Sequence, residues 1–431
     1  MTSIPPQEEA HVVIVDYEDV RKDPSPGHSL ASLLEKAYGS SGSLGILAIR
    51  NVPGFVSAKR AFLPMAHTLA HLPNDYLQEK LTDVDSMYNA GWSHGKEKLG
   101  DEPDWAKGSF YFNPLTDQPG TQEDRAKFPA SYPCNIWPDR IPDFEVNAKR
   151  IGTLMKDVVV HLSKHLDAFA HEKNPEYAPD TLYQAMKTTE KVKGRLLYYF
   201  PLSCQDATSE DSWIGWHNDS GFLTALAGDL YVNDDTGEVL SESPDPNAGL
   251  YVVDRQDRVV HVSIPHDCMA VQMGECVQIL SGGSVVATPH CVRGVVVAQN
   301  VVDRQDHVVH VSIPRDCMAV HMGECVQILT GGSVVATPHC VRGVVVAQSS
   351  SGSGNSHLPV ARISLPCFID LPPNVPLCMP GCTKEQVLTA GVGSSRVPPL
   401  SARWTHNGML FGDFLQKTFS LYYDWSSSKA E

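Results

Sequence analysis

The sequence lacks a long hydrophobic run. Nowhere in its 431 residues do about 18 apolar residues follow one another, which argues against an ordinary membrane-spanning helix. Basic side chains are also scarce: 34 Lys and Arg stand against 50 Asp and Glu, giving a net charge of −16, and no Lys/Arg cluster interrupts this excess. Because such a surface repels phosphate groups, we expect neither nucleic acid nor a membrane among the partners.

A secretory signal and a disulfide framework are missing as well. The N-terminal segment carries acidic residues and no basic stretch, and the 11 cysteines are odd in number and widely spread. This usage is typical of reduced thiols, so we expect an intracellular, cytoplasmic protein. Hydrophobic residues at 42% and charged residues at 19% are ordinary for a folded chain, which excludes extensive disorder. Nothing in the sequence indicates an oligomeric state.

What the sequence does contain is a tandem duplication. Residues 252–299 recur almost unchanged as residues 301–348, as VVDRQD-VVHVSIP-DCMAV-MGECVQIL-GGSVVATPHCVRGVVVAQ. Solenoid repeats diverge more and need at least three copies for stability, so a recent exon-scale duplication, or an error in the gene model, explains the near-identity better. We therefore expect only one copy in the functional core. The paired positions that differ are Arg258 and His307, His266 and Arg315, Gln272 and His321, and Ser281 and Thr330.

The hydrophobic pattern predicts an α+β protein. Apolar residues recur at intervals of three and four over residues 151–169, which predicts one long amphipathic helix. Short Val- and Ile-rich runs separated by Gly and Asp follow it, as in an antiparallel barrel or sandwich. A further helix is expected near residues 409–420. The expected divisions are an N-terminal α/β region (1–135), a long helix with its connector (136–190), a β-rich domain (191–372) containing both copies (252–300 and 301–349), and a helical extension (373–431).

The segment WHND carries the first chemical signal. In an extended strand residues i and i+2 share a face, so His217 and Asp219 are expected to project together. His290, in SVVATPHCVRG, or its duplicate His339 is the candidate third ligand. Two imidazoles and a carboxylate on one face of an octahedron make the facial triad of non-haem Fe(II) oxygenases, which leaves three coordination positions for a co-substrate and O2.

A second signal is the pair Arg362 and Ser364, again two residues apart on one predicted strand. A guanidinium beside a hydroxyl can bind a carboxylate. Taken alone, HxD and RxS are more often surface pairs than sites. Their order along the chain, with a strand histidine between them, favours an iron site.

The chain resembles the 2-oxoglutarate/Fe(II)-dependent oxygenases of the isopenicillin N synthase-like (clavaminate synthase-like) group. The segments RLLYYFPLSC, WHNDSGFLTAL, SVVATPHCVRG, ARISLPCFID and MLFGDFLQKTF match that family's motifs in order. The resemblance implies a double-stranded β-helix (jelly-roll) core with flanking helices. It also implies Fe(II) held by His217, Asp219 and a distal histidine, and 2-oxoglutarate bound through Arg362 and Ser364. Tyr198, or its neighbour, is expected to add a contact to the co-substrate.

The duplication leaves two candidates for the distal histidine. Arg362 lies 23 residues after His339 and 72 after His290, whereas relatives keep these motifs close together. The first copy, however, continues directly from GLY at residues 249–251, so its opening strand is whole. The second copy then enlarges a loop, which costs only about 0.6 kcal/mol per doubling of length. We therefore favour His290, with His339 as the alternative.

The resemblance implies an oxidoreductase that uses Fe(II), 2-oxoglutarate and O2 to oxidise a small organic molecule. Hydroxylation, desaturation or ring closure would accompany release of succinate and CO2, with no catalytic side chain beyond the metal ligands. One alternative is an oxidase of the same fold that takes its electrons from substrate or ascorbate. Another is a silent small-molecule binder whose barrel the duplication disturbs. A zinc module is a third, since Cys268, Cys276 and Cys291 recur in the second copy, although strand cysteines are more often small hydrophobic core residues.

Overall fold

The structure is a computed structural model of the chain, and it describes the residue ranges given at the end of this paragraph. His339, and with it the second copy of the duplication, lies outside those ranges. The described residues are 10–39, 43–96, 98–99, 102–201, 214–241, 249–253, 259–263, 268–274, 276–277, 290–293, 359–389 and 399–422.

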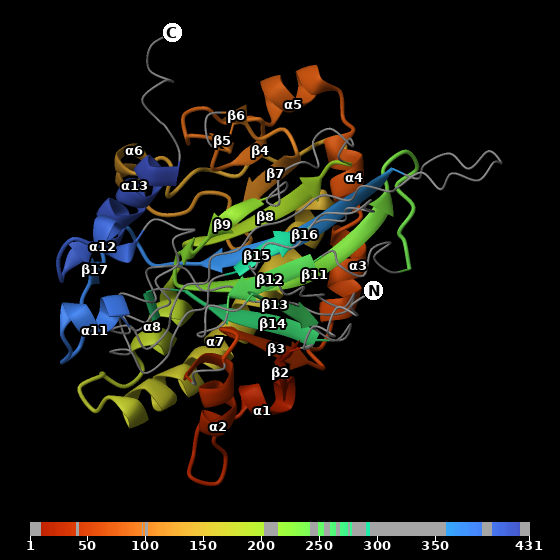
Figure 1. Cartoon of the computed structure of the whole chain (residues 1–431). Coiled ribbons are helices and arrows are strands. Elements are labelled where there is room, and N and C mark those ends of the chain that lie inside the picture. Colours follow the sequence, from red (N-terminus) through yellow and green to blue (C-terminus); the bar gives the residue numbers. More distant parts are fainter. Residues whose placement is uncertain are drawn as a thin grey trace, which may run out of the picture.

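Two facing sheets form the core (Figure 1). The main sheet has eight strands and is antiparallel except for the β2–β3 pair. In spatial order they are β2 (Val13–Asp16), β3 (Ile46–Arg50), β14 (Cys268–Met273), β11 (Leu223–Asn233), β16 (Val360–Ile369), β8 (Val192–Tyr199), β7 (Lys107–Phe112) and β4 (Gly91–His94).

The second sheet has five strands and lies in front of the main sheet in Figure 1. First-copy residues form two of its strands, β13 and β15, and the last two residues of a third, β12. In spatial order they are β1 (Ala10–His11), β13 (Val259–Ser263), β12 (Gly249–Val253), β15 (His290–Arg293) and β9 (Ile214–His217). The predicted α+β fold with a double-stranded β-helix core is confirmed.

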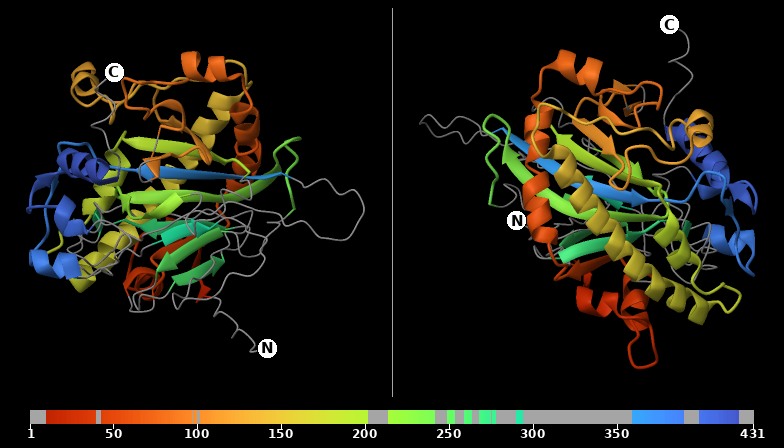
Figure 2. Two further views of the ribbon diagram at one scale, coloured as in Figure 1. Left: turned by 45° about the horizontal axis from the view of Figure 1, so that its top comes forward. Right: turned by 180° about the vertical axis from the view of Figure 1, so that it is seen from behind.

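The predicted long helix is α7 (Phe144–Lys173), which crosses the back of the main sheet (Figure 2). Its buried face includes Ile151, Met155 and Leu162, at the predicted three- and four-residue spacing. It contacts β8, β11 and β16, whose residues on that side are apolar, for example Ile363 and Leu365 of β16. Because side chains alternate along a strand, the residues between them, Arg362 and Ser364 among them, face the second sheet.

The remaining elements are short and surround this core. The predicted C-terminal helix is α13 (Phe411–Tyr422). The other helices are α1 (Tyr17–Arg21), α2 (Ala31–Leu34), the π-helix η1 (Glu35–Gly39), α3 (Phe55–Phe62), α4 (Met65–Ala70), α5 (Asn74–Lys80), α6 (Gln122–Lys127), α8 (Thr181–Thr188), α11 (Lys384–Thr389) and α12 (Leu400–Arg403). The other strands are β5 (Lys98–Leu99), β6 (Glu102–Pro103), β10 (Asp219–Ser220), β17 (Pro376–Leu377) and β18 (Met409–Leu410). Of the helices described, none has the length and apolar character needed to span a bilayer.

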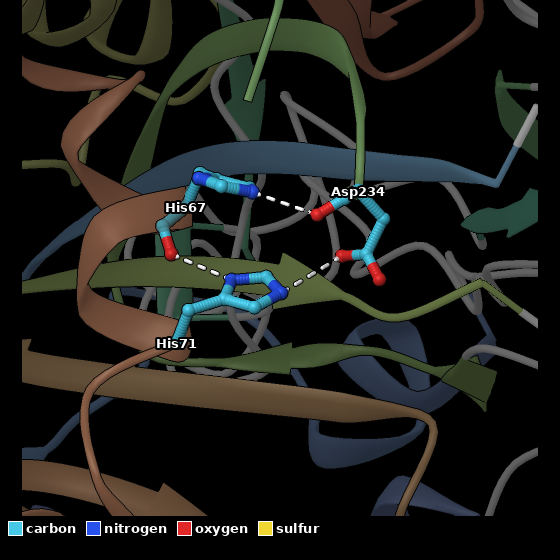
Figure 3. Close-up of side chains that lie close together, drawn as sticks. All are labelled: His67, His71 and Asp234. Carbon is cyan, nitrogen blue, oxygen red and sulfur yellow. Dashed lines mark hydrogen bonds and ion pairs between the residues drawn. The ribbon is translucent and has the colours of Figure 1, made fainter. Parts of the chain in front are cut away.

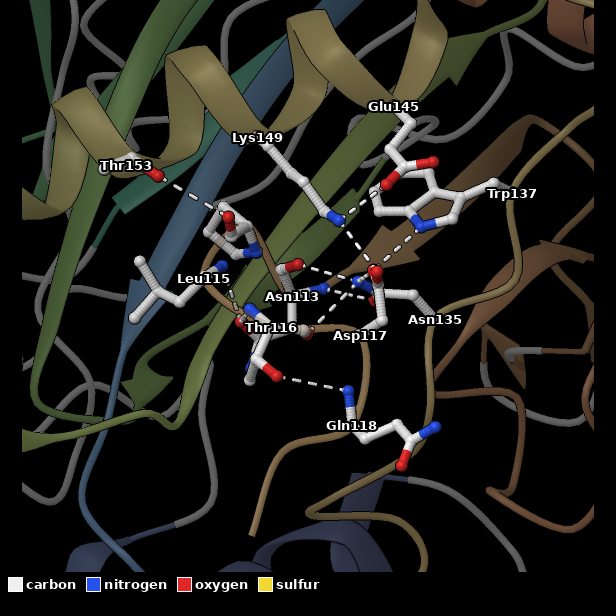
Figure 4. Close-up of polar contacts among 11 residues, drawn as sticks. Asn113, Leu115, Thr116, Asp117, Gln118, Asn135, Trp137, Glu145, Lys149 and Thr153 are labelled. Atoms are coloured by element: carbon white, nitrogen blue, oxygen red, sulfur yellow. Dashed lines mark hydrogen bonds and ion pairs between the residues drawn. The ribbon is translucent and has the colours of Figure 1, made fainter.

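A polar network fastens the connection after β7 to α7 (Figure 4). The carboxylate of Asp117 accepts hydrogen bonds from Asn135 Nδ2 at 2.9 Å, Trp137 Nε1 at 2.9 Å and Lys149 Nζ at 2.8 Å. Lys149, on α7, also donates to Glu145 one turn earlier at 2.6 Å. One carboxylate thus holds together side chains from the connection and from the helix.

Candidate metal centre

Three side chains from the second sheet and the adjoining strand β10 converge at one end of the barrel. His217 ends β9, Asp219 begins β10, and His290 begins β15 directly opposite His217 in the antiparallel register. Each offers one ligand atom, and these atoms all lie within 4.8 Å of one another. Asp219 and His290 are buried. The structure thus brings together the three residues expected as metal ligands, with the first-copy histidine in the third position.

The environment of Asp219 suits a cation. Burial raises the pKa of this carboxyl from 3.8 to about 7, opposed by the neighbouring Thr224 side chain and by the charge of Arg195, while Asp370 raises it further. A dication beside the carboxylate would favour its ionised form. Two imidazoles with one carboxylate are also the donor set of non-haem Fe(II) sites, so these residues fit ferrous iron.

Arg362 lies on the inner face of β16, where it is 2% exposed. Its cross-strand neighbours are Tyr199 on β8 and Tyr231 on β11, and its guanidinium lies 4.8 Å from the centre of the Tyr199 ring. Nη2 donates to the carboxylate of Asp229. Nε and Nη1 are buried without a hydrogen-bond partner. Because buried donors normally find acceptors, two open donors on one guanidinium fit a carboxylate ligand.

Ser364 follows on the same face of β16 and is also buried. The structure therefore places the two members of the predicted co-substrate pair side by side on one strand, facing the second sheet.

The structure does not bring Tyr198 to this site. Strand alternation turns its side chain to the opposite face of β8, where its hydroxyl donates to Asp234. Tyr199, one residue later, is the tyrosine that contacts Arg362. The one-residue ambiguity in the strand alignment explains the difference, since a shift by one reverses the face.

Asp229 was missed in the sequence, although a lone carboxylate within the apolar run LTALAGDLYV was a signal. It lies where the pairing of β11 with β16 shifts register between Ala227 and Leu230, so simple alternation cannot predict its direction. It is 3% exposed and forms an ion pair with Arg362.

Arg195 was missed for a different reason, because the strand RLLYYF looks almost wholly apolar. Its Nε donates to Ser109 Oγ at 3.1 Å, and its guanidinium lies 5.2 Å from the centre of the Tyr111 ring. Its charge lowers the pKa of Asp219, which places a cationic group near the candidate metal ligands.

The zinc alternative receives no support from the described cysteines. Cys268 and Cys276 are buried, and within the described part of the chain no cysteine belongs to a group that could hold a metal. The side chain of Cys291 and the second-copy cysteines lie outside the described residues.

Comparisons with known proteins bear on the fold. No family model matches the sequence, and no curated protein matches it. Among solved structures, a full-length protein of Neurospora crassa in complex with α-KG is similar with a TM-score of 0.56 and 12% identity, over 95% of this chain and 96% of that one. JOX2, in complex with 2OG, Fe and JA, is similar with a TM-score of 0.53 and 15% identity, over 97% of this chain and 90% of that one.

A dioxygenase for auxin oxidation from rice is also similar, with a TM-score of 0.50 and 15% identity, over 95% of each chain. At these identities the likeness concerns the backbone. The chain shares the fold of the 2-oxoglutarate/Fe(II) oxygenases.

Proposed function

We propose that this chain is a 2-oxoglutarate-dependent Fe(II) oxygenase. His217, Asp219 and His290 are the proposed iron ligands, and Arg362 with Ser364 is the proposed seat of the distal carboxylate of 2-oxoglutarate. The substrate is a small organic molecule, oxidised by hydroxylation, desaturation or ring closure with release of succinate and CO2. Two observations support the proposal: the ligand atoms of His217, Asp219 and His290 lie within 4.8 Å of one another, and Arg362 is buried on the face of β16 that strand alternation turns toward the second sheet.

In this proposal the iron and its three ligands have separate roles. Ferrous iron, when bound, supplies the activation of O2 and the oxidative decarboxylation of 2-oxoglutarate. Both histidines must be neutral to coordinate, and Asp219 must be ionised, so the bare ligands give up protons when metal binds. Burial of Asp219 and His290 keeps bulk water from the ligands.

Arg362 orients the co-substrate in this proposal. Asp229 occupies Nη2, which leaves Nε and Nη1 as buried donors that a carboxylate ligand can satisfy. Tyr199 lies against the guanidinium and Tyr231 lies across from it, so the side chain has little freedom to turn away. Three of the solved neighbours point to the same chemistry: the Neurospora crassa protein was crystallised with α-KG, JOX2 with 2OG and Fe, and the rice protein is described as a dioxygenase.

The direct test is O2 consumption and succinate release by the Fe(II)-loaded chain, with and without 2-oxoglutarate, across a panel of small organic acids and heterocycles. We expect 2-oxoglutarate-dependent succinate formation that at least one panel member accelerates. O2 uptake that proceeds equally without 2-oxoglutarate would favour the oxidase alternative. One iron bound per chain with no O2 uptake under any condition would favour the silent binder.

A further inference from the structure

A second group of metal-ligating side chains lies on the outer side of the main sheet (Figure 3). It consists of His67 on α4, His71 at the C-terminal cap of that helix, and Asp234 immediately after β11. Their ligand atoms lie within 4.8 Å of one another. Tyr198, which contacts both imidazole rings from β8, faces away from Arg362, so the sheet separates this group from the candidate iron ligands.

The hydrogen bonds of His71 determine which ring nitrogen is open. Its Nδ1 lies 2.8 Å from the backbone carbonyl oxygen of His67, and a carbonyl can only accept, so Nδ1 carries the hydrogen. In the neutral ring Nε2 then presents a lone pair. A metal-bound histidine usually has this arrangement, with its second nitrogen donating to a backbone carbonyl.

His71 Nε2 lies 3.5 Å from a carboxylate oxygen, Asp234 Oδ1. That separation exceeds the roughly 2.7–3.2 Å of a good N–H···O hydrogen bond. It matches the edge of a tetrahedral site, because ligands about 2.0–2.1 Å from a zinc ion lie roughly 3.4 Å apart. Two acceptors at this distance favour a cation between them.

Asp234 is held in place independently of any cation. Its carboxylate accepts the Tyr198 hydroxyl, and its backbone N–H donates to the carbonyl of Pro359 at 2.8 Å. Its own backbone carbonyl oxygen lies 2.8 Å from His67 Nε2. Metal-ligating carboxylates usually have such hydrogen-bond partners, which hold the ligand in position.

The approach from solvent is open on one side. The His71 side chain is 41% exposed and that of Asp234 is 20% exposed, so an ion can reach them without opening the fold. The two imidazoles belong to one turn of helix, with ring centres 4.2 Å apart, and this spacing of four residues is one that zinc sites use.

We propose that His67, His71 and Asp234 form a second metal site, for a divalent transition ion of the zinc type. His71 Nε2 and Asp234 Oδ1 are the two preset ligands. His67 Nε2 is the third. It donates to the carbonyl of Asp234 in the metal-free chain, so it must leave that carbonyl and its ring must carry the proton on Nδ1 instead when the ion enters. The ion would fasten the end of α4 to the end of β11.

The test removes the iron site first, so that it does not depend on the proposed oxygenase activity. The full chain carrying His217→Ala and Asp219→Asn is stripped of metal and its accessible thiols are alkylated, because Cys134 and Cys378 are exposed. Zn²⁺ binding is measured by calorimetry, and the thermal midpoint is measured with and without Zn²⁺. We expect one Zn²⁺ per chain and a higher midpoint.

Adding His71→Ala to this background should abolish both effects, and adding Asp234→Asn, which keeps an acceptor for Tyr198, should do the same. His406→Ala is the matched control, because His406 is exposed and lies outside the cluster. No Zn²⁺ uptake in the background chain, or uptake that survives His71→Ala, would overturn the proposal and leave an ordinary histidine–aspartate ion pair.

Discussion

His217 and His290 face each other across the β9–β15 pair, with 5.7 Å between their ring centres. This register supports the proposal that His290, from the first copy of the duplication, is the distal histidine. The duplication provides a matched control for mutating His290, because His339 has the same local sequence 49 residues later.

Replacing His290 by Ala should therefore abolish Fe(II) binding, since two ligands without the third hold the ion poorly. His339→Ala should leave one Fe(II) per chain. Anaerobic Fe(II) titration followed by succinate assay measures both variants. The reverse pattern, with loss of iron only in His339→Ala, would transfer the ligand role to the second copy.

Replacing Arg362 by Ala should raise the 2-oxoglutarate concentration needed for half-maximal succinate formation. Hydrogen bonds to a charged group contribute about 1.5–3 kcal/mol, which corresponds to roughly 10- to 100-fold. Iron binding should be unaffected, so the same Fe(II) titration serves as the control. Ser364→Ala, which removes only a hydroxyl, should have a smaller effect. An unchanged 2-oxoglutarate requirement in Arg362→Ala would place the co-substrate elsewhere.

Asp229 should also affect co-substrate binding, because its carboxylate neutralises the charge of Arg362 before 2-oxoglutarate binds. Asp229→Asn keeps an acceptor for Nη2 but removes the negative charge. The 2-oxoglutarate requirement should fall several-fold, while the thermal midpoint without 2-oxoglutarate should drop because a buried cation loses its counter-ion. A higher requirement would mean that Asp229 acts mainly by orienting the guanidinium. Midpoints measured with and without 2-oxoglutarate separate the two effects.

The fold, and the grouping of two histidines with Asp219, could be predicted from the sequence because both depend on local patterns. The three- and four-residue period predicted α7, and strand alternation placed Arg362 and Ser364 on one face. Chain continuity at residues 249–251 favoured His290, and β12 does pair with both β13 and β15.

The remaining residues could not be predicted from the sequence, because their positions depend on strand register and on contacts between segments far apart in the chain. Asp229 follows a shift in strand pairing, and Tyr198 was one residue away from the tyrosine that faces Arg362. The His67–His71–Asp234 group joins segments more than 160 residues apart, so no local motif contains all three ligands. A pair of histidines four residues apart is too common to indicate a site without its carboxylate.

Asp167 gives a prediction about stability that is independent of the metal sites. This carboxyl of α7 is 2% exposed, and it accepts hydrogen bonds from the Tyr177 hydroxyl and from the backbone N–H groups of Leu182 and Tyr183. Burial nevertheless raises its pKa from 3.8 to about 7, against the opposing effect of those hydrogen bonds.

Between about pH 4 and 7 the folded chain therefore keeps a proton on Asp167 that the unfolded chain has lost. Because the folded state binds more protons in that window, the free energy of unfolding should fall as the pH rises, by at most about 1.4 kcal/mol per pH unit from this group. The Asn side chain of Asp167→Asn cannot titrate, so the free energy of unfolding should depend less on pH in this window. The loss of a carboxylate acceptor should lower that free energy at every pH. Urea unfolding of the metal-free chain at pH 5 and pH 8 measures the difference. Asp157 is exposed on the same helix, so Asp157→Asn should keep the wild-type dependence of the free energy of unfolding on pH. The same dependence in Asp167→Asn would show that the Asp167 carboxyl stays ionised in the folded chain.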